Sequence, residues 1–439
     1  MQLKSKQIKS RLKELSDDRK SVLTLMGGTT IAQALNFLFS PIQTRLFSPA
    51  VFGQLSVFTS ITGIVGVIVC LRYELAIILP KKDDEAFSLY KLSILFAGMV
   101  SILTGFIFFF EGKEIYQSFG AQELQKYWYY VPINLLSGGF ILASNYWLTR
   151  RRQFKILSLN KVIPVLAVNI VSIALGLFGK IDIGARLFAI LISNFINILV
   201  LVKPIMQSYR NNNSAKLFEI IDLIKRYKNF LVYDIWSALL NNLSWMIVPI
   251  LMNSFFSSYE AGQYSISLRV IQLPMTILGG TYAQVFFKNA SEKYYMGELY
   301  ELTIATLKRL ARIVLPFFLI FILLGDRIFV LLFGNQWQMG GRFTQILSLY
   351  MVTAFIASPI STVLTIVGKQ NISLVFNFVV LALRVISLLI AKMANDCYLG
   401  MILFSITGSF FNLYNIFYFN KASKKSDIIM KEKVSNGCH

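Results

Sequence analysis

Long apolar blocks separated by short polar stretches run through the whole sequence. Six blocks of about twenty residues come before a polar stretch at 205–228, and six more follow it. A helix that rises 1.5 Å per residue needs about twenty apolar residues to cross a bilayer. The pattern therefore predicts an all-α membrane protein with about twelve transmembrane helices. The predicted spans are 21–42, 54–79, 86–110, 127–149, 158–178, 184–204, 229–253, 262–287, 303–325, 343–368, 370–391 and 398–420.

The polar stretches divide the chain into two predicted six-helix bundles. We expect the first at 21–204 and the second at 229–420, joined by a cytoplasmic linker at 205–228. A basic arm at 1–20 precedes the first apolar block, which is too long for a signal-peptide core and lacks a cleavage-site pattern. The lysine-rich tail at 421–439 has a composition typical of disorder.

Composition and charge agree with a chain that faces lipid. Charged residues make up 15% of the chain and apolar types 55%, whereas a soluble domain has about 25% charged residues. The net charge of +21 would indicate nucleic acid in a soluble protein. Here, however, 31 Lys and Arg residues lie on the side of the N-terminus, eight lie on the other side, and four lie within spans. By the positive-inside rule, both termini are expected in the cytoplasm.

Two pairs of matching segments indicate an internal duplication. Residues 47–56 and 256–265 are identical at five of ten positions, and Phe-Gly-Ala-Gln at 119–122 corresponds to Phe-Gly-Asn-Gln at 333–336. Chance within a biased composition is the alternative, but two matches at equivalent places favour duplication. Six spans per half give parallel repeats about an axis along the membrane normal, with a substrate site expected between the halves.

The sequence contains no recognisable catalytic module. Its longest polar stretch has about 25 residues, far fewer than a domain needs, and the segment 176–181 lacks the glycine and Ser/Thr positions of a Walker motif. The three cysteines have no paired spacing, and the only histidine is His439, so we expect no metal site. We therefore predict a transporter rather than an enzyme, with no catalytic residues and no cofactor.

Ionisable residues inside the spans are the first candidates for a substrate site. They are costly in lipid, so they usually line a cavity or pair with one another. Three arginines, Arg72, Arg269 and Arg384, are candidate substrate-binding residues, and Glu74 and Asp234 are candidates for ion coupling or ion pairing. Ion pairs that join helices are the alternative for each of them. The excess of cations indicates an anionic substrate, and arginine forks suit phosphate oxygens.

Amide side chains within the spans are the second candidates. Asn241 and Asn242 are predicted to line the cavity and to bond sugar hydroxyls, although close helix packing is the alternative. Lys161, the remaining cation in a span, is close enough to the membrane interface to extend its amine to water.

Four segments resemble one known family. They are 28–33 (Gly-Thr-Thr-Ile-Ala-Gln), 40–49 (Ser-Pro-Ile-Gln-Thr-Arg-Leu-Phe-Ser-Pro), 71–80 (Leu-Arg-Tyr-Glu-Leu-Ala-Ile-Ile-Leu-Pro) and 333–337 (Phe-Gly-Asn-Gln-Trp). These look like the bacterial polysaccharide-biosynthesis flippases called Wzx, which export O-antigen and capsule repeat units. The family is part of the multidrug/oligosaccharidyl-lipid/polysaccharide (MOP) exporter superfamily.

The resemblance implies a structure and a function. It implies two six-helix bundles in a V and alternating access to a cationic cavity. It also implies export of an oligosaccharide on undecaprenyl diphosphate across the bacterial cytoplasmic (inner) membrane, for O-antigen in lipopolysaccharide biosynthesis or for capsule. Implied partners are this lipid-linked substrate, membrane lipid and other polysaccharide-assembly membrane proteins, but no nucleic acid. Of the three candidate arginines, only Arg72 lies in a matching segment, so Arg269 and Arg384 rest on the charge argument alone. The alternative is a cation-coupled multidrug exporter of the same superfamily, in which embedded carboxylates would outnumber cations.

Overall fold

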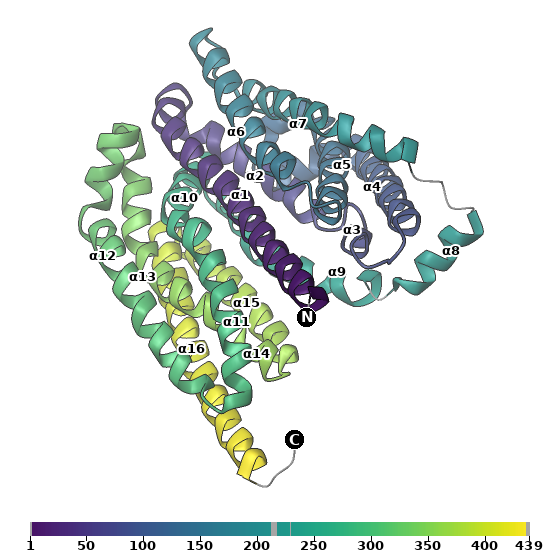
Figure 1. The fold of residues 1–439 in the computed structure, drawn as a ribbon. Helices are drawn as coiled ribbons and strands as arrows, with labels where there is room; N and C mark the ends of the chain where they lie inside the picture. The colour runs from purple at the N-terminus through teal and green to yellow at the C-terminus, as the bar shows by residue number, and fades with distance from the viewer. Residues whose placement is uncertain (1, 212–216, 229, 436–439) are drawn as a thin grey trace. The chain divides into compact units, whose positions relative to one another are not determined.

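The computed structural model describes residues 2–211, 217–228 and 230–435, and every regular element in these ranges is a helix (Figure 1). Within them, nine helical segments are long and apolar enough to cross a membrane. The predicted class, an all-α membrane protein, is confirmed. The nine segments are Pro49–Gly66, Asp83–Ser118, Phe154–Leu177, Ile183–Tyr209, Phe230–Phe255, Leu299–Phe333, Asn335–Ile366, Val375–Ala394 and Cys397–Glu432.

Three further predicted spans are helical but shorter or more polar. The span 21–42 is part of one long helix, α1, that also includes most of the basic arm. The span 127–149 corresponds to α5, whose polar residues include Ser144 and Asn145. The span 262–287 is divided between α10 and α11 by a π-helical turn, η3. The bounds are α1 Gln2–Leu46, α5 Tyr130–Arg150, α10 Ser258–Ile271, η3 Met275–Gly279 and α11 Gly280–Met296.

The chain forms two compact units, each with its own core. The first unit consists of residues 1–46, 61–115 and 123–239. In it, α1 packs on α6, and α7 packs on both α5 and α6. The helices introduced here are α3 Tyr73–Ala76, α4 Asp83–Ser118, α6 Phe154–Leu177, α7 Ile183–Asn211 and α8 Leu217–Arg226, with the π-helical turn η2 at Phe230–Asp234.

The second unit combines residues 240–439 with two short segments from earlier in the chain, 47–60 and 116–122. Its centre is α13, which packs against α12, α16 and α10 (Figure 1). Buried side chains such as Leu310, Phe318 and Phe404 form its core. The further helices are α2 Pro49–Gly66, α9 Ile235–Phe255, α12 Leu299–Phe333, α13 Gln338–Ile360, α14 Val363–Ile366, α15 Gln370–Ala394 and α16 Cys397–Ser435.

The apolar run 54–79 is not one continuous helix. The helix α2 ends at Gly66, and the chain resumes helical structure only in the single turn of α3. Between them, Leu71 has φ of 50° and Arg72 has φ of 64°. Both values lie in the left-handed region that side chains other than glycine rarely adopt. The short helix α3, which follows this break, packs next to the turn η2. Arg72 and Glu74, one on each side of Tyr73 in the sequence, therefore lie close to η2.

The lysine-rich tail is helical over residues 421–435, so the prediction of disorder is wrong there, while residues 436–439 lie outside the described ranges. Here α16 continues as a helix, and the buried carboxylate of Asp427 accepts the backbone N–H groups of Leu299 at 2.9 Å and Tyr300 at 2.8 Å. A carboxylate at this place satisfies free N–H groups at the start of α12 and stabilises its positive end. Composition alone could not indicate this contact, because it joins residues 128 positions apart.

Candidate functional site

Arg72, Glu74 and Asp234 form a cluster in the first unit, which we call the charged centre. Nε of Arg72 donates a hydrogen bond to Oδ2 of Asp234 at 2.7 Å. A terminal nitrogen of the same guanidinium lies 3.6 Å from Oε1 of Glu74. The structure thus brings together three of the seven predicted site residues. Ion pairing was one of the two roles predicted for Glu74 and Asp234, whereas for Arg72 it was the alternative to substrate binding.

Two irregular backbone segments position the charged centre. Arg72 is in the left-handed region immediately before α3, a conformation that costs about 1–3 kcal/mol. Asp234 is the last residue of the π-helical turn η2, directly before α9. Discontinuous helices and π-turns within membrane spans are frequent at substrate and ion sites, because they free backbone groups and redirect side chains.

The three charges differ in their access to the surroundings. The side chain of Glu74 is 1% exposed, that of Arg72 is 22% exposed and that of Asp234 is 41% exposed. Neither carboxylate oxygen of Glu74 accepts a hydrogen bond from another described side chain. Carboxylates therefore outnumber cations in this centre. The excess of cations predicted over all the spans is a property of the whole sequence and is not found within this centre, since the other candidate arginines lie in the second unit.

Arg384 lies in the second unit, in an enclosed aromatic site. Its guanidinium carbon is 4.0 Å from the ring centroid of Trp245 and 5.3 Å from that of Phe404. Its terminal nitrogens donate to the backbone carbonyl and to Oγ of Ser244, the latter at 2.8 Å, and to the hydroxyl of Tyr350 at 2.7 Å. Only 4% of the residue is exposed, and no described carboxylate pairs with it. Arg384 thus joins α9, α13, α15 and α16.

The remaining predicted residues lie elsewhere in the second unit. The guanidinium carbon of Arg269, a half-buried residue of α10, is 5.9 Å from the ring centroid of Phe52. Asn241 is exposed on α9, and Asn242 beside it is half-buried. Sequence reasoning missed Ser244, Trp245 and Tyr350 as the surroundings of Arg384. Nothing in the local pattern indicates these contacts, which reach across 140 positions for Ser244.

The first pair of matching segments meets inside the second unit. A Cβ added at Gly53 would overlap the carbonyl oxygen of Ser258, and one added at Gly262 would overlap that of Pro49. Each such Cβ would also lie 3.0 Å from the backbone nitrogen of the other glycine. Residues 49 and 258, like 53 and 262, occupy equivalent positions in the two matching segments. We call this crossing of α2 and α10 the glycine seam.

The second pair of matching segments also makes polar contacts in this unit. The amide of Asn253 donates to the carbonyl oxygen of Phe119 at 2.6 Å, beside Gly120, which has φ of 68°. The amide of Gln263 donates to the carbonyl oxygen of Gln336 at 2.6 Å. Both matching pairs therefore help to hold the same unit together.

Comparisons with known proteins indicate a family and a fold. A family model described as polysaccharide biosynthesis protein matches residues 42–341, well over half of the chain. No curated protein matches the sequence in a direct comparison.

Among solved structures, three similar ones share 13–16% identity with this chain. The lipid II flippase MurJ, in an inward closed conformation, has a TM-score of 0.75 and 13% identity, with 94% of this chain and 93% of that one covered. An inward-facing multidrug resistance MATE family transporter of the MOP superfamily has a TM-score of 0.68 and 16% identity, covering 91% and 96%. A MOP superfamily transporter from Pyrococcus furiosus has a TM-score of 0.61 and 14% identity, covering 93% and 96%. At such identities the likeness shows the fold, that of MOP transporters.

Proposed function

The chain belongs to the polysaccharide biosynthesis protein family, and from this premise we propose that it is a flippase for a lipid-linked oligosaccharide. The substrate is an O-antigen or capsule repeat unit on undecaprenyl diphosphate, carried from the cytoplasmic to the periplasmic leaflet. The observation that carries the proposal is the family match over 42–341, which includes the charged centre, Arg269 and both asparagines. The fold shared with a lipid II flippase supports it, because lipid II is itself a lipid-linked substrate.

In the proposed mechanism, Arg72 exchanges one anionic partner for another. Its hydrogen bond to the partly exposed Asp234 is replaced by one to a diphosphate oxygen, while the buried Glu74 remains close. A charge-assisted hydrogen bond to phosphate suits the planar guanidinium. Arg269 is a further candidate contact for the diphosphate, and Asn241 and Asn242 are candidates for the sugar. Arg384, also predicted from the sequence as a substrate contact, has its donors satisfied by Ser244 and Tyr350 and is left out of this mechanism. No covalent bond is made or broken, so the proposed function is transport rather than catalysis.

The glycine seam supports alternating access as the transport mode. In the proposed mechanism this close contact of α2 and α10 closes one end of the transport path, and the two helices separate when a bulky sugar leaves there. Gly53→Ala or Gly262→Ala should lower export about tenfold or more, because the added methyl meets backbone rather than a flexible side chain. Gly66→Ala, on the same helix α2 with open space around it, is the matched control. Equal export in all three variants would remove the seam from the mechanism.

The proposed location is the bacterial cytoplasmic (inner) membrane, with both termini in the cytoplasm. Reporter fusions after Lys20, Arg152, Lys216 and Lys433 should report cytoplasm, and fusions near Lys113 or Glu260 should report the outer side. The one-sided distribution of Lys and Arg supports this orientation. A reversed signal from a central loop would break the twelve-span topology.

The decisive experiment is deletion of the protein followed by localisation of lipid-linked repeat units. They should accumulate in the cytoplasmic leaflet of the deletion strain and reach the periplasmic leaflet again when the wild-type chain is restored. Normal periplasmic repeat units in the deletion strain would refute the proposal.

A cation-coupled multidrug exporter is the second candidate, favoured by the excess of carboxylates in the charged centre. Drug sensitivity of the same deletion strain, with normal repeat-unit export, would favour this candidate.

A further inference from the structure

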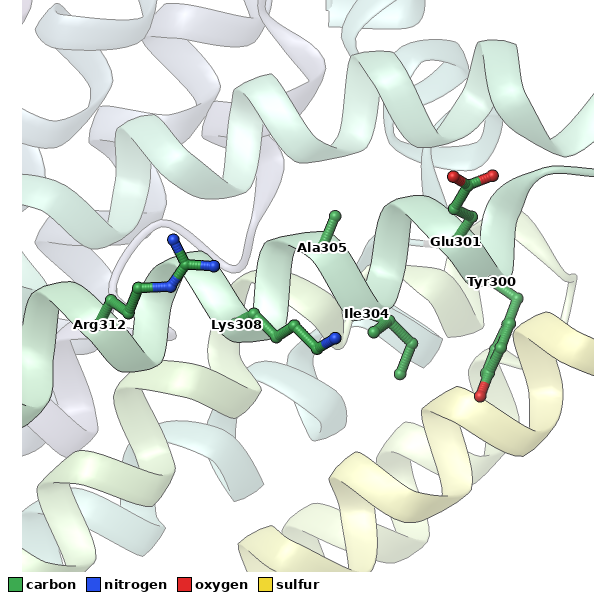
Figure 2. Close-up of a pocket in the computed structure, with 6 residues that line it drawn as sticks. All are labelled: Tyr300, Glu301, Ile304, Ala305, Lys308 and Arg312. Carbon is green, nitrogen blue, oxygen red and sulfur yellow. The ribbon is translucent and has the colours of Figure 1, made fainter.

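The start of α12 carries a surface hollow that the proposed mechanism does not use. The hollow measures about 440 Å³ and is lined by Tyr300, Glu301, Ile304, Ala305, Lys308 and Arg312. Figure 2 shows these six side chains following one another along a single helix. The hollow therefore belongs to one helix of the second unit and shares no residue with the charged centre.

The two cations of the hollow are available to a ligand. Lys308 and Arg312 are exposed and one helical turn apart, and neither has an ion pair or hydrogen bond with any described residue. The neighbouring Arg309 has its guanidinium carbon 5.8 Å from the ring centroid of Tyr282. The single acid of the hollow, Glu301, interacts electrostatically with Lys293 on α11. The charge that remains is positive and suits a phosphate group.

An exposed apolar stripe continues from these cations along the same helix. Ile304, Lys308, Arg312, Leu315, Leu319 and Leu323 are spaced by three or four residues, so they share one face. Leu315 is 51% exposed, Leu319 55% and Leu323 65%. The opposite face is buried in the core through Leu310, Val314 and Phe318.

The length of the stripe matches a lipid in one leaflet. Leu315 to Leu323 spans about 12 Å at 1.5 Å per residue, and one leaflet contributes roughly 15 Å of hydrocarbon. A ligand that has a phosphate at one end and acyl chains at the other fits both parts. We propose that the α12 hollow and stripe bind an anionic phospholipid of the bilayer, with its phosphate between Lys308 and Arg312 and an acyl chain along the three leucines. This lipid is bound at the periphery and is not the transported substrate.

Native mass spectrometry of the full-length protein tests the proposal. The purified protein is titrated separately with phosphatidylglycerol, with zwitterionic phosphatidylcholine and with undecaprenyl phosphate. We expect the wild-type protein to retain one phosphatidylglycerol molecule. The double variant Lys308→Gln with Arg312→Gln should bind this lipid with about thirtyfold lower affinity, because each cation near an anionic lipid contributes about a factor of five. The matched control is Lys424→Gln with Lys425→Gln, which removes the same charge from exposed positions on α16 outside the hollow. The control should bind like the wild type.

A second pair of variants tests the apolar stripe. The double variant Leu315→Ser with Leu319→Ser should bind phosphatidylglycerol more weakly. Its binding of glycerol phosphate, which has no acyl chain, should be unchanged. Thermal unfolding in lipid-free detergent should be the same for all variants, so that a folding defect is not mistaken for lost binding.

Four outcomes would overturn the proposal. They are equal losses in the hollow variant and the α16 control, equal retention of phosphatidylcholine, full retention of phosphatidylglycerol by the stripe variant, and stronger binding of undecaprenyl phosphate than of phosphatidylglycerol. Equal losses in the two charge variants would mean that lipid binding depends only on net charge. Stronger binding of undecaprenyl phosphate would mean that the carrier lipid, and not a bilayer phospholipid, occupies the hollow.

Discussion

Arg72 and Arg384 are both arginines within predicted spans, yet the structure gives them opposite surroundings. Arg72 is partly exposed, stands on a broken helix and has two carboxylate neighbours. Arg384 is buried in an unbroken helix, among three aromatic rings and two hydroxyl-bearing residues. An arginine paired with a partly exposed carboxylate can change partner, whereas an arginine whose donors are already satisfied in a closed site stabilises packing. Position within a span is therefore not enough to assign a role.

The largest expected effect tests the enclosed arginine. Arg384→Ala should destabilise the second unit by about 3–5 kcal/mol, as removal of a large buried side chain does, and should leave Ser244 and Tyr350 without their donor. Thermal unfolding of the detergent-solubilised protein measures it, with the exposed Arg342→Ala on α13 as control. If Arg384→Ala kept wild-type stability but lost export, Arg384 would instead be a contact for the diphosphate, which is the role we assign to Arg72.

The next effect tests the exchangeable arginine. Arg72→Ala should leave the amount of inserted protein normal but reduce export about ten- to hundredfold, through loss of a charge-assisted bond of ~1.5–3 kcal/mol. Arg72→Lys should rescue part of the activity, because the charge is kept and the fork is lost. Complementation of the deletion strain measures export, and Lys161→Ala, an exposed cation in the same unit, is the control. Full export by Arg72→Ala would leave the charged centre with a structural role only.

A smaller effect is expected at the carboxylates. If Glu74 and Asp234 only balance Arg72, Glu74→Gln and Asp234→Asn should reduce export a few-fold at most. Export in cells with and without a collapsed proton gradient, alongside immunoblots of membrane levels, measures this difference. A loss as severe as that of Arg72→Ala would instead indicate that one of these carboxylates carries a coupling proton.

The smallest expected effect is at the asparagines, on the same helix α9 that supplies Ser244 to Arg384. Asn241→Leu or Asn242→Leu should lower export several-fold, since a neutral hydrogen bond is worth about 1 kcal/mol, while membrane levels stay normal. Unchanged export in both variants would indicate that these two asparagines serve helix packing rather than sugar binding.

The sequence predicts the helical class and the spans because both depend on local composition. Blocks of apolar residues and the loops rich in Lys and Arg between them are visible without any knowledge of contacts. The break at Leu71 and Arg72 was not predictable in this way. Neither residue is glycine or proline, and Gly66 is five positions away. A left-handed conformation at Arg72 is retained through tertiary contacts such as the hydrogen bond to Asp234, 162 positions later.

The candidate site was predictable in its residue types but not in its partners. An ionisable residue in a span is a visible signal, so Arg72, Glu74, Asp234 and Arg384 could be selected. Which of them would meet depends on long-range packing, and so does the hydrogen bond from Arg384 to Ser244. The tail shows the same limit, since its lysines suggested disorder, while long-range contacts such as those of Asp427 with the start of α12 hold it as a helix.

The glycine seam also preserves a trace of how the chain arose. A contact in which residue 53 meets 258 while residue 262 meets 49 is self-complementary, as is the isologous interface of a twofold homodimer. Before duplication and fusion, a six-span ancestor would have contacted a second copy of itself at one glycine position, with one glycine from each copy. Fusion would have turned that one position into two that are inherited separately. In both halves, the segment that forms the seam would still have to fit its former copy.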